Sequence, residues 1–311
     1  MTAAMVFPGQ GSQSPGMQAA LAERFPVVRA TYDEAGDVLG EDLWALTQRG
    51  PADRLAETTT TQPVMLAAGV AAFRAWREAG GARPAQVAGH SLGEYTALVC
   101  ANALDFAEAV AVVRRRAGLM QAAVPAGEGA MAAILGLDDD AVDAVCREVG
   151  DAGVAEPVNY NSPGQVVIAG EAVAVAVAIE RAKAAGAKRA ILLPVSVPSH
   201  SSLMQGAAGA LAETLAATAF RTPDITVVSA VTAAPYRDAA DIRRLLAEQI
   251  HRPVRWTATV EAMAAAGASS FVECGPGKVL AGLIRRIDKS LSVHALEDPA
   301  SLEQAVADTR G

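Results

Sequence analysis

The segment Gly89-His90-Ser91-Leu92-Gly93 constrains the fold of this chain more than any other feature. It fits the pattern G-x-S-x-G, follows a short apolar strand predicted over Gln86–Gly89, and precedes a helical run that begins at Glu94. A strand, a sharp turn and a helix in that order form the context of a nucleophile elbow. We therefore interpret Ser91 as an exposed nucleophile above a helix N-terminus. The alternative is a tight turn in which Ser91 only caps the helix.

Strand-like and helical segments alternate on both sides of this turn, which predicts an α/β fold. Strands are expected over Ala3–Phe7, Ile225–Ser229 and Ser270–Glu273. Helices are expected over Met17–Gly40 with a break near Pro26, Gln62–Gly80 opening at Pro63, Asp105–Ala123 with Asp105 as N-cap, Ala239–His251, Trp256–Ala266 and Val279–Ile287.

The pattern changes after residue 126. The predicted elements there follow the order β-α-β-β-α-β, which is the split ferredoxin-like unit. They are a strand over Ala130–Leu137, a helix over Asp138–Gly150, strands over Pro157–Tyr160 and Gln165–Ala169 around a turn, a helix over Glu171–Gly186 and a strand over Arg189–Val197. We therefore expect residues 1–126 and 198–311 to form one discontinuous α/β body, with residues 127–197 inserted as a small subdomain.

Composition excludes several classes of protein. The hydrophobic fraction of 51% is largely alanine, and the longest uncharged stretch, Ala190–Ala212, contains two prolines and a histidine, so we expect no membrane span. The first basic residue is Arg24, so no secretory signal is predicted. Three widely spaced cysteines fit free thiols in a reducing cytoplasm and suggest no metal site. A net charge of −8 makes nucleic acid a poor candidate partner.

A serine nucleophile needs a base, and the chain has four histidines. His90 is adjacent to Ser91, so its side chain should point away from the hydroxyl. His200 leaves the apolar strand Ile191–Val197 in a tight polar segment, where α/β sheets build sites, and we favour it as general base. The alternative is a turn histidine that bonds Ser202. No Asp or Glu is convincingly placed as a third member.

Two glycine-rich turns resemble nucleotide loops but fail those patterns. Phe7–Gln13 fails G-x-G-x-x-G because position 14 is serine, and Gly275–Lys278 fails the phosphate-loop pattern. We interpret the second as a strand-to-helix turn. The first would present a backbone N–H at Gln10, which could complete an oxyanion hole with the N–H of Leu92.

The run Arg114-Arg115-Arg116 lies on a predicted helix. Arg116 alone has apolar residues both three and four positions before it and after it, so it is the arginine expected to point inward. A buried arginine must meet an anion. Its anion is either an internal carboxylate or the carboxylate of a substrate, and the sequence leaves both open.

Several motifs together resemble the bacterial malonyl-CoA:acyl carrier protein transacylase family. The resemblance runs in order over nearly the whole chain. It rests on residues 7–13 (FPGQGSQ), 89–95 (GHSLGEY), 159–165 (NYNSPGQ), 198–200 (PSH) and 275–278 (GPGK). It implies a hydrolase-like parallel-sheet body with a ferredoxin-like insert.

The resemblance also implies roles for individual residues. Ser91 becomes the acyl-accepting nucleophile and His200 its base, with Gln10 and Leu92 as oxyanion donors. Arg116 becomes the clamp for the malonyl carboxylate, although the family often has glycine and a bulkier residue at the two positions that follow. Gln249 matches a glutamine whose backbone carbonyl orients the histidine. The implied substrate-binding residues are Arg116, Gln10, Met120, Asn161 and Ser199.

The implied activity is transfer of malonyl from malonyl-CoA to the phosphopantetheine thiol of acyl carrier protein, through a malonyl-serine, to supply fatty-acid elongation. Coenzyme A thioester is a substrate, so no cofactor is expected, and the resemblance implies a cytoplasmic monomer. The alternatives are an acyltransferase that loads a polyketide synthase, a serine esterase or thioesterase, and a non-catalytic carrier-binding module. We expect carrier protein to dock at the basic residues Lys278, Arg285, Arg286 and Lys289.

Overall fold

Strand β1 (Ala3–Phe7) is an inner strand of the large sheet in the computed structural model, which describes residues 2–195 and 197–309. The strand order is β10-β9-β1-β2-β7-β8, and every neighbouring pair is parallel except β7 and β8. The other strands are β2 (Gln86–Gly89), β7 (Thr226–Ser229), β8 (Ala234–Pro235), β9 (Ser270–Glu273) and β10 (Ser292–Ala295).

Both faces of this sheet are buried, which explains why its inner strands read as continuous apolar runs. Alternate side chains point to opposite faces. Ala4 and Val6 join a cluster with Trp256 from α12 (Trp256–Ala265) and Leu280 from α13 (Val279–Ile287). Met5 and Phe7 join the larger cluster on the other face. That cluster draws on α1 (Ala19–Arg24), α2 (Pro26–Leu39), α3 (Leu43–Arg49), α4 (Ala52–Ala56), α5 (Thr58–Glu78), α6 (Gly93–Cys100), α7 (Phe106–Ala122), α10 (Gln205–Ala217), α11 (Ala239–Gln249) and α14 (Pro299–Thr309).

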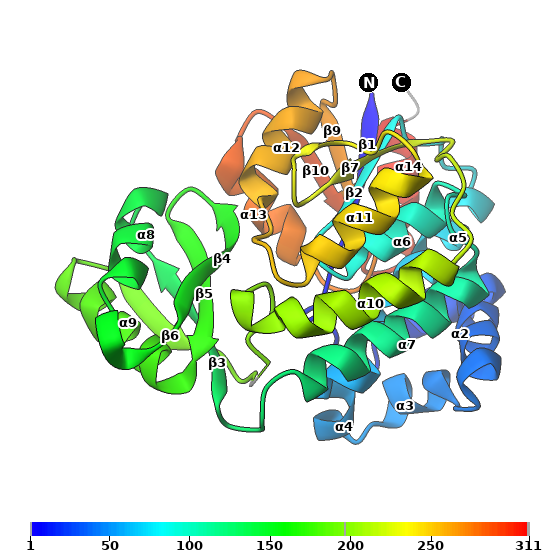
Figure 1. The fold of residues 1–311 in the computed structure, drawn as a ribbon. Helices are drawn as coiled ribbons and strands as arrows, with labels where there is room; N and C mark the ends of the chain where they lie inside the picture. The colour runs from blue at the N-terminus through cyan, green and yellow to red at the C-terminus, as the bar shows by residue number, and fades with distance from the viewer. Residues whose placement is uncertain (1, 196, 310–311) are drawn as a thin grey trace.

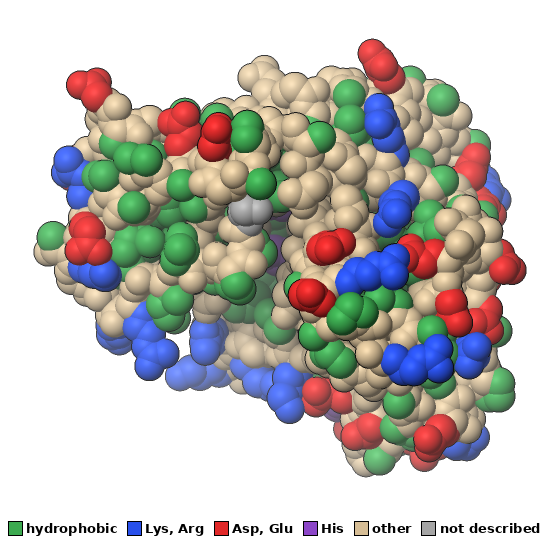
Figure 2. Space-filling view, turned by 90° about the horizontal axis from the view of Figure 1, so that it is seen from below, with side chains coloured by type: hydrophobic (Ala, Val, Ile, Leu, Met, Phe, Trp, Pro, Cys, Tyr) green, Lys and Arg blue, Asp and Glu red, His purple; other side chains and the backbone are tan. Residues whose placement is uncertain are grey.

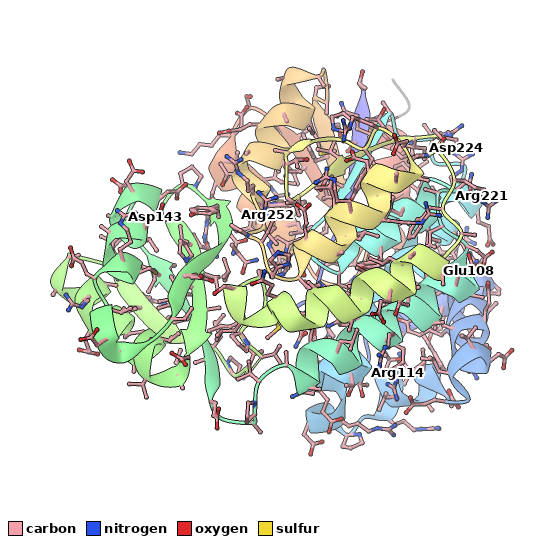
Figure 3. The ribbon with its side chains drawn as sticks, in the orientation of Figure 1. Glu108, Arg114, Asp143, Arg221, Asp224 and Arg252 are labelled. Carbon is pink, nitrogen blue, oxygen red and sulfur yellow. The ribbon has the colours of Figure 1, made fainter. Side chains whose placement is uncertain are left out.

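Helix α5 begins at Thr58, five residues before the start that Pro63 predicts, so that prediction was wrong. Proline lacks the N–H that would bond the carbonyl four residues earlier. Here the Thr59 carbonyl instead accepts a hydrogen bond from Arg114 Nη1 at 2.7 Å, so the helix passes through the proline. Figure 3 labels Arg114, which lies on α7. In the described part of the chain, no helix is both long and apolar enough to cross a membrane.

A second, antiparallel sheet forms the smaller lobe on the left of Figure 1. Its strand order is β4-β5-β3-β6. The elements are β3 (Gly129–Leu135), α8 (Asp139–Arg147), β4 (Ala155–Ser162), β5 (Gln165–Glu171), α9 (Ala172–Ala184) and β6 (Arg189–Leu192). The lobe has a hydrophobic core of its own between this sheet and its two helices. The predicted fold class, a parallel-sheet body with a β-α-β-β-α-β insert, is confirmed, while the residue boundaries at 126/127 and 197/198 remain a prediction.

Strand β6 is shorter than expected. The sequence predicts a strand over Arg189–Val197, whereas the strand ends at Leu192. Leu193 still donates from its N–H to the Met131 carbonyl at 2.8 Å, but Pro194 has no N–H to continue the ladder. Ser196 lies outside the described residues. Leu193, Pro194 and Val195 instead line the cavity described below.

The loops that matter for function leave the large sheet at one edge. β1 and β2 are parallel neighbours, and Phe7 pairs with Gly89 at their carboxyl ends. The loops that begin at Pro8 and His90 therefore emerge side by side. In open α/β sheets, ligands bind outside the carboxyl ends of the strands.

Candidate active site

The turn at Ser91 has the geometry of a nucleophile elbow. Ser91 has a backbone φ of 52°, in the left-handed region that non-glycine residues rarely adopt. Its flanking glycines are required by close approach of the backbone. A Cβ at Gly93 would lie 2.0 Å from the Phe7 carbonyl oxygen, and one at Gly89 would lie 1.8 Å from the Gly93 carbonyl carbon. Strand, turn and helix therefore pack too tightly here for any side chain.

His200 lies 109 residues after Ser91 in the chain, and the fold brings its ring beside the serine hydroxyl. Its Nε2 lies 2.7 Å from Ser91 Oγ, and its Nδ1 lies 2.7 Å from the Gln249 carbonyl oxygen. A carbonyl can only accept, so Nδ1 carries the proton and Nε2 accepts from the serine hydroxyl. The alternative that the sequence left open, a hydrogen bond between this ring and Ser202, is not found among the described residues.

The Gln249 carbonyl takes the place of a triad acid. Gln249 is the last residue of α11, so its carbonyl belongs to the negative end of the helix dipole. That end favours the imidazolium that forms when His200 takes a proton. Burial, and after it the charge of Arg116, lowers the pKa of His200 to about 3. The imidazole is therefore neutral at pH 7 and available as a base.

Arg116 lies within reach of the nucleophile and is only 1% exposed. Its Nη2 donates to Ser91 Oγ at 3.2 Å and to Gln249 Oε1 at 3.0 Å. Its Nη1 donates to Gln62 Oε1 at 2.6 Å. Within residues 2–195 and 197–309, Arg116 Nε has no hydrogen-bond acceptor, and no carboxylate lies within 4.0 Å of the guanidinium. The sequence left open an internal carboxylate or a substrate carboxylate as the anion for Arg116, and in this part of the chain no internal carboxylate contacts the guanidinium directly.

The two expected oxyanion donors lie on the adjacent loops. A Cβ at Gly9 would lie 2.7 Å from the His90 carbonyl oxygen, so the loop that carries Gln10 contacts the loop that carries Leu92. Among the described residues, neither the Gln10 nor the Leu92 backbone N–H donates a hydrogen bond. Two unused donors beside a serine nucleophile are what an oxyanion hole requires.

These groups line a cavity of about 470 Å³ between the body and the smaller lobe. Figure 2 shows the hollow, with a histidine side chain visible inside it. Met120, Asn161 and Ser199, the other predicted binding residues, also line it. Asn161 Oδ1 accepts from His90 Nε2 at 2.8 Å, so the His90 ring is held by Asn161. The rest of the wall is largely apolar and includes Met131, Val167, Leu193, Val197, Val279 and Leu283.

Sequence reasoning missed two polar residues of the site. Gln62 holds Arg116 Nη1 and donates from Nε2 to the Met120 sulfur at 3.6 Å. Its signal was an amide directly before the unbroken apolar run of residues 63–73. Glu94, in the first turn of α6, is fully buried and accepts a hydrogen bond from Gln249 Nε2. Its signal was a carboxylate next to the elbow, where the sequence indicated only the start of a helix.

The predicted docking cluster lies partly beside the cavity. Arg286 Nη1 donates to Gln165 Oε1, a cavity-lining side chain, at 2.6 Å. Lys278 pairs with Glu297 at 3.2 Å, and Arg285 donates to the Val293 carbonyl at 2.7 Å. The chain as described brings together no group of three or more His, Cys, Asp or Glu that could hold a metal ion.

A serine nucleophile, a neutral base, two free backbone donors and a buried cation together suit a particular chemistry. They fit attack on an acyl carbonyl whose acyl group carries a negative charge.

Comparison with known proteins agrees with this geometry. Residues 4–304 match the family model described as acyl transferase domain. The chain is 53% identical over 303 residues to malonyl CoA-acyl carrier protein transacylase of Salmonella typhimurium, covering 97% of this chain and 98% of the relative. It is 45% identical over 304 residues to the protein of the same name from Bacillus subtilis, covering 97% and 96%.

Solved structures are similar over the same length. An acyl-carrier-protein S-malonyltransferase from Burkholderia pseudomallei is 54% identical with a TM-score of 0.97, covering 99% of this chain and all of that one. A structure of a type II PKS acyl-carrier protein in complex with its malonyl-transacylase contains a chain 52% identical with a TM-score of 0.98, again covering 99% and 100%.

Proposed function

Because the chain belongs to the acyl transferase domain family, we propose that it transfers the malonyl group of malonyl-CoA to the phosphopantetheine thiol of an acyl carrier protein. One observation carries the choice of acyl group: Arg116 is buried beside the nucleophile, with no carboxylate within 4.0 Å in the described chain. A serine esterase has no need of such a cation, and a carrier-binding module has no need of the Ser91–His200 pair. An enzyme that loads a polyketide synthase would share this chemistry and differ in its carrier.

The first half-reaction forms a malonyl-serine. Ser91 Oγ loses its proton to His200 Nε2 and attacks the thioester carbonyl of malonyl-CoA. The backbone N–H groups of Gln10 and Leu92 stabilise the oxyanion. His200 returns the proton to the sulfur of coenzyme A, which leaves. In the second half-reaction, His200 takes the proton of the carrier's thiol, and the resulting thiolate attacks the carbonyl carbon of the malonyl-serine ester. The bond between that carbon and Ser91 Oγ then breaks, and His200 returns the proton to Ser91 Oγ, which frees the serine and leaves malonyl on the carrier's sulfur.

The malonyl carboxylate would be the direct anionic partner of Arg116. It would accept hydrogen bonds from the Arg116 guanidinium, whose hydrogen-bond partners in the described chain are all neutral oxygens. Acetyl groups are then rejected because they leave the buried cation unpaired. Neutralising Arg116 also removes one cause of the low pKa of His200, so the bound substrate strengthens its own base.

Carrier protein is proposed to reach the cavity mouth at Lys278, Arg285, Arg286 and Lys289. Arg286 contacts the cavity-lining Gln165, and Val279, next to Lys278, is 49% exposed on the rim. Charge reversal at these residues should raise KM for carrier protein and leave KM for malonyl-CoA unchanged. An unchanged KM for carrier protein would rule out this docking face.

Intact mass measurement after mixing the protein with malonyl-CoA alone tests the proposal. We expect a single malonyl adduct that is absent in Ser91→Ala and is discharged by carrier protein. Steady release of free malonate without carrier protein would indicate a hydrolase. No reaction at all would leave only the binding module.

A further inference from the structure

Gln249 forms hydrogen bonds to the base, the buried cation and the nucleophile's backbone at the same time. Its carbonyl oxygen accepts from His200 Nδ1, and its side-chain Oε1 accepts from Arg116 Nη2 at 3.0 Å. Its side-chain Nε2 donates to the Ser91 carbonyl at 3.0 Å and to Glu94 Oε2. Gln249 is fully buried, so these hydrogen bonds do not compete with bulk water.

Glu94 is the ionisable group at the far end of this chain of contacts. It is fully buried, and its Oε1 accepts from the Tyr236 hydroxyl at 2.6 Å and from the Ala230 N–H at 3.3 Å. Burial raises the pKa of Glu94, and the hydrogen bonds from Tyr236 and Gln249 oppose that rise. Its charge also acts on Arg116, where it opposes the burial that lowers the pKa of the guanidinium.

The orientation of the Gln249 amide follows from what surrounds it. The Ser91 carbonyl and the Glu94 carboxylate only accept hydrogen bonds, so the amide must turn its NH₂ group toward them. Its oxygen is then left to face Arg116, which only donates. The Glu94 carboxylate thus favours the one amide orientation that gives Arg116 an acceptor beside Ser91.

We propose that Glu94 is a positioning residue that acts through the Gln249 amide to hold Arg116 ready for the carboxylate of the acyl group. This role rests on the proposed malonyl transfer. Glu94 lies behind Gln249, touches no reacting atom and takes no proton in the reaction. Its effect is on which acyl group the site prefers.

Glu94→Gln tests this role with little change in shape. The new amide must keep its oxygen toward Tyr236 and the Ala230 N–H, so its NH₂ group meets the NH₂ group of Gln249. Turning the Gln249 amide relieves that conflict but points a donor at Arg116 and loses the bond to Ser91. We expect the ratio of kcat/KM for malonyl-CoA to that for acetyl-CoA to fall at least tenfold.

Glu273→Gln is the matched control. Glu273 is also fully buried, and its carboxylate accepts from the N–H groups of Leu280 and Ala281 in α13, which forms part of the cavity wall. It has no link to Arg116 or Gln249 among its hydrogen bonds. Activity on both substrates should change together, with the malonyl-to-acetyl ratio kept within twofold. A tenfold fall of the malonyl-to-acetyl ratio in Glu273→Gln would overturn the proposal. So would an equal loss of kcat/KM for both substrates in Glu94→Gln.

A stability cycle covers the case in which Glu94→Gln is too unstable to assay. Glu94 and Arg116 make no direct ion pair, but they are opposite buried charges joined through Gln249, so removing one leaves the other less compensated, whereas removing both does not. Arg116→Ala should therefore be less damaging to Tm in the Glu94→Gln background than in the wild-type background. Equal changes in Tm in both backgrounds would contradict the coupling. A wild-type enzyme that shows no preference for malonyl-CoA would instead refute the proposed function, before any variant is compared.

Discussion

Helix α11 carries two polar networks that differ in their exposure to water. On its outer face, Arg244 pairs with Asp241 at 2.6 Å and with Glu248 at 2.8 Å, and Arg252 adds a contact to Glu248 at 2.6 Å. On its inner side, the next residue after Glu248 is Gln249, which is fully buried and bonds His200, Arg116 and Glu94. Figure 3 labels Arg252, just beyond the end of this helix.

The two networks differ in whether water can replace a lost partner. The outer arginines are at least half exposed, so water can replace the partner that one of them loses. Asp241 is only 5% exposed, but it also pairs with Arg237 at 2.9 Å and so keeps a partner when Arg244 is removed. The inner groups have no water to replace a lost partner, and each bond limits the orientation of the next. Two adjacent residues on one helix therefore belong to a tolerant network and to an intolerant one, and substitutions can compare the two directly.

His200→Ala should have the largest effect, because it removes the base itself. We expect the rate of acyl-serine formation to fall by about 10³-fold with malonyl-CoA and with acetyl-CoA alike. Rapid quenching followed by intact mass measurement gives this rate. His294→Ala, in the half-buried edge strand β10, should stay within twofold. Comparable losses in the two variants would remove His200 from its role.

Gly93→Ala should be the next most severe change, since its Cβ would lie 2.0 Å from the Phe7 carbonyl oxygen. We expect a loss of about 3 kcal/mol in the free energy of unfolding together with loss of activity. Gly118 lies in α7, and a Cβ there would meet open space. Because alanine favours helix over glycine, Gly118→Ala should raise the free energy of unfolding by about 0.5–1 kcal/mol. Urea unfolding measures both, and a Gly93→Ala variant as stable as Gly118→Ala would show that the turn is not tightly packed.

The fall in kcat/KM at acid pH depends on the pKa of His200, which the charge of Arg116 in the inner network affects. The pKa of His200 is lowered to about 3, so kcat/KM for acetyl-CoA should stay level from pH 8 down to about pH 5. Removing the positive charge in Arg116→Ala stabilises the imidazolium and raises that pKa, so the fall in activity moves to higher pH. A limb that stays in place, or moves to lower pH, would mean that Arg116 does not act on His200.

Arg244→Ala should have the smallest effect. It removes both ion pairs of a side chain that is 50% exposed. We expect the free energy of unfolding to fall by less than about 1 kcal/mol. Activity should stay within twofold. An effect on kcat/KM as large as that of Glu94→Gln would erase the distinction between the two networks.

Local pattern predicted the strands of the body well. Ala3–Phe7, Gln86–Gly89 and Ser270–Glu273 match the observed strands residue for residue, because buried strands are apolar runs that glycine or proline ends. Helix α10 was not predicted, since Gly206, Gly209 and many alanines give its sequence a weak period. The start of α5 was misplaced because Arg114, 55 residues away, supplies the bond that makes Pro63 tolerable.

Contacts between residues distant in the sequence also limited what could be predicted of the site. Ser91 stands in a short recognisable pattern, and the inward position of Arg116 follows from the helical period. Gln62 and Glu94 were missed because their partners Arg116 and Gln249 lie 54 and 155 residues away in the chain. Only the fold brings them within hydrogen-bond distance. A buried polar residue in an apolar segment signals that a partner exists and does not name it.

The central claim is that Arg116 selects an acyl group by its carboxylate. An equimolar mixture of malonyl-CoA and acetyl-CoA, added to the wild-type protein and to Arg116→Ala and resolved by intact mass, tests it most directly. We predict that Ser91 carries malonyl almost alone in the wild type, and that Arg116→Ala loses the malonyl adduct while it keeps or gains the acetyl adduct. An equal loss of both adducts, or an unchanged ratio between them, would contradict the claim.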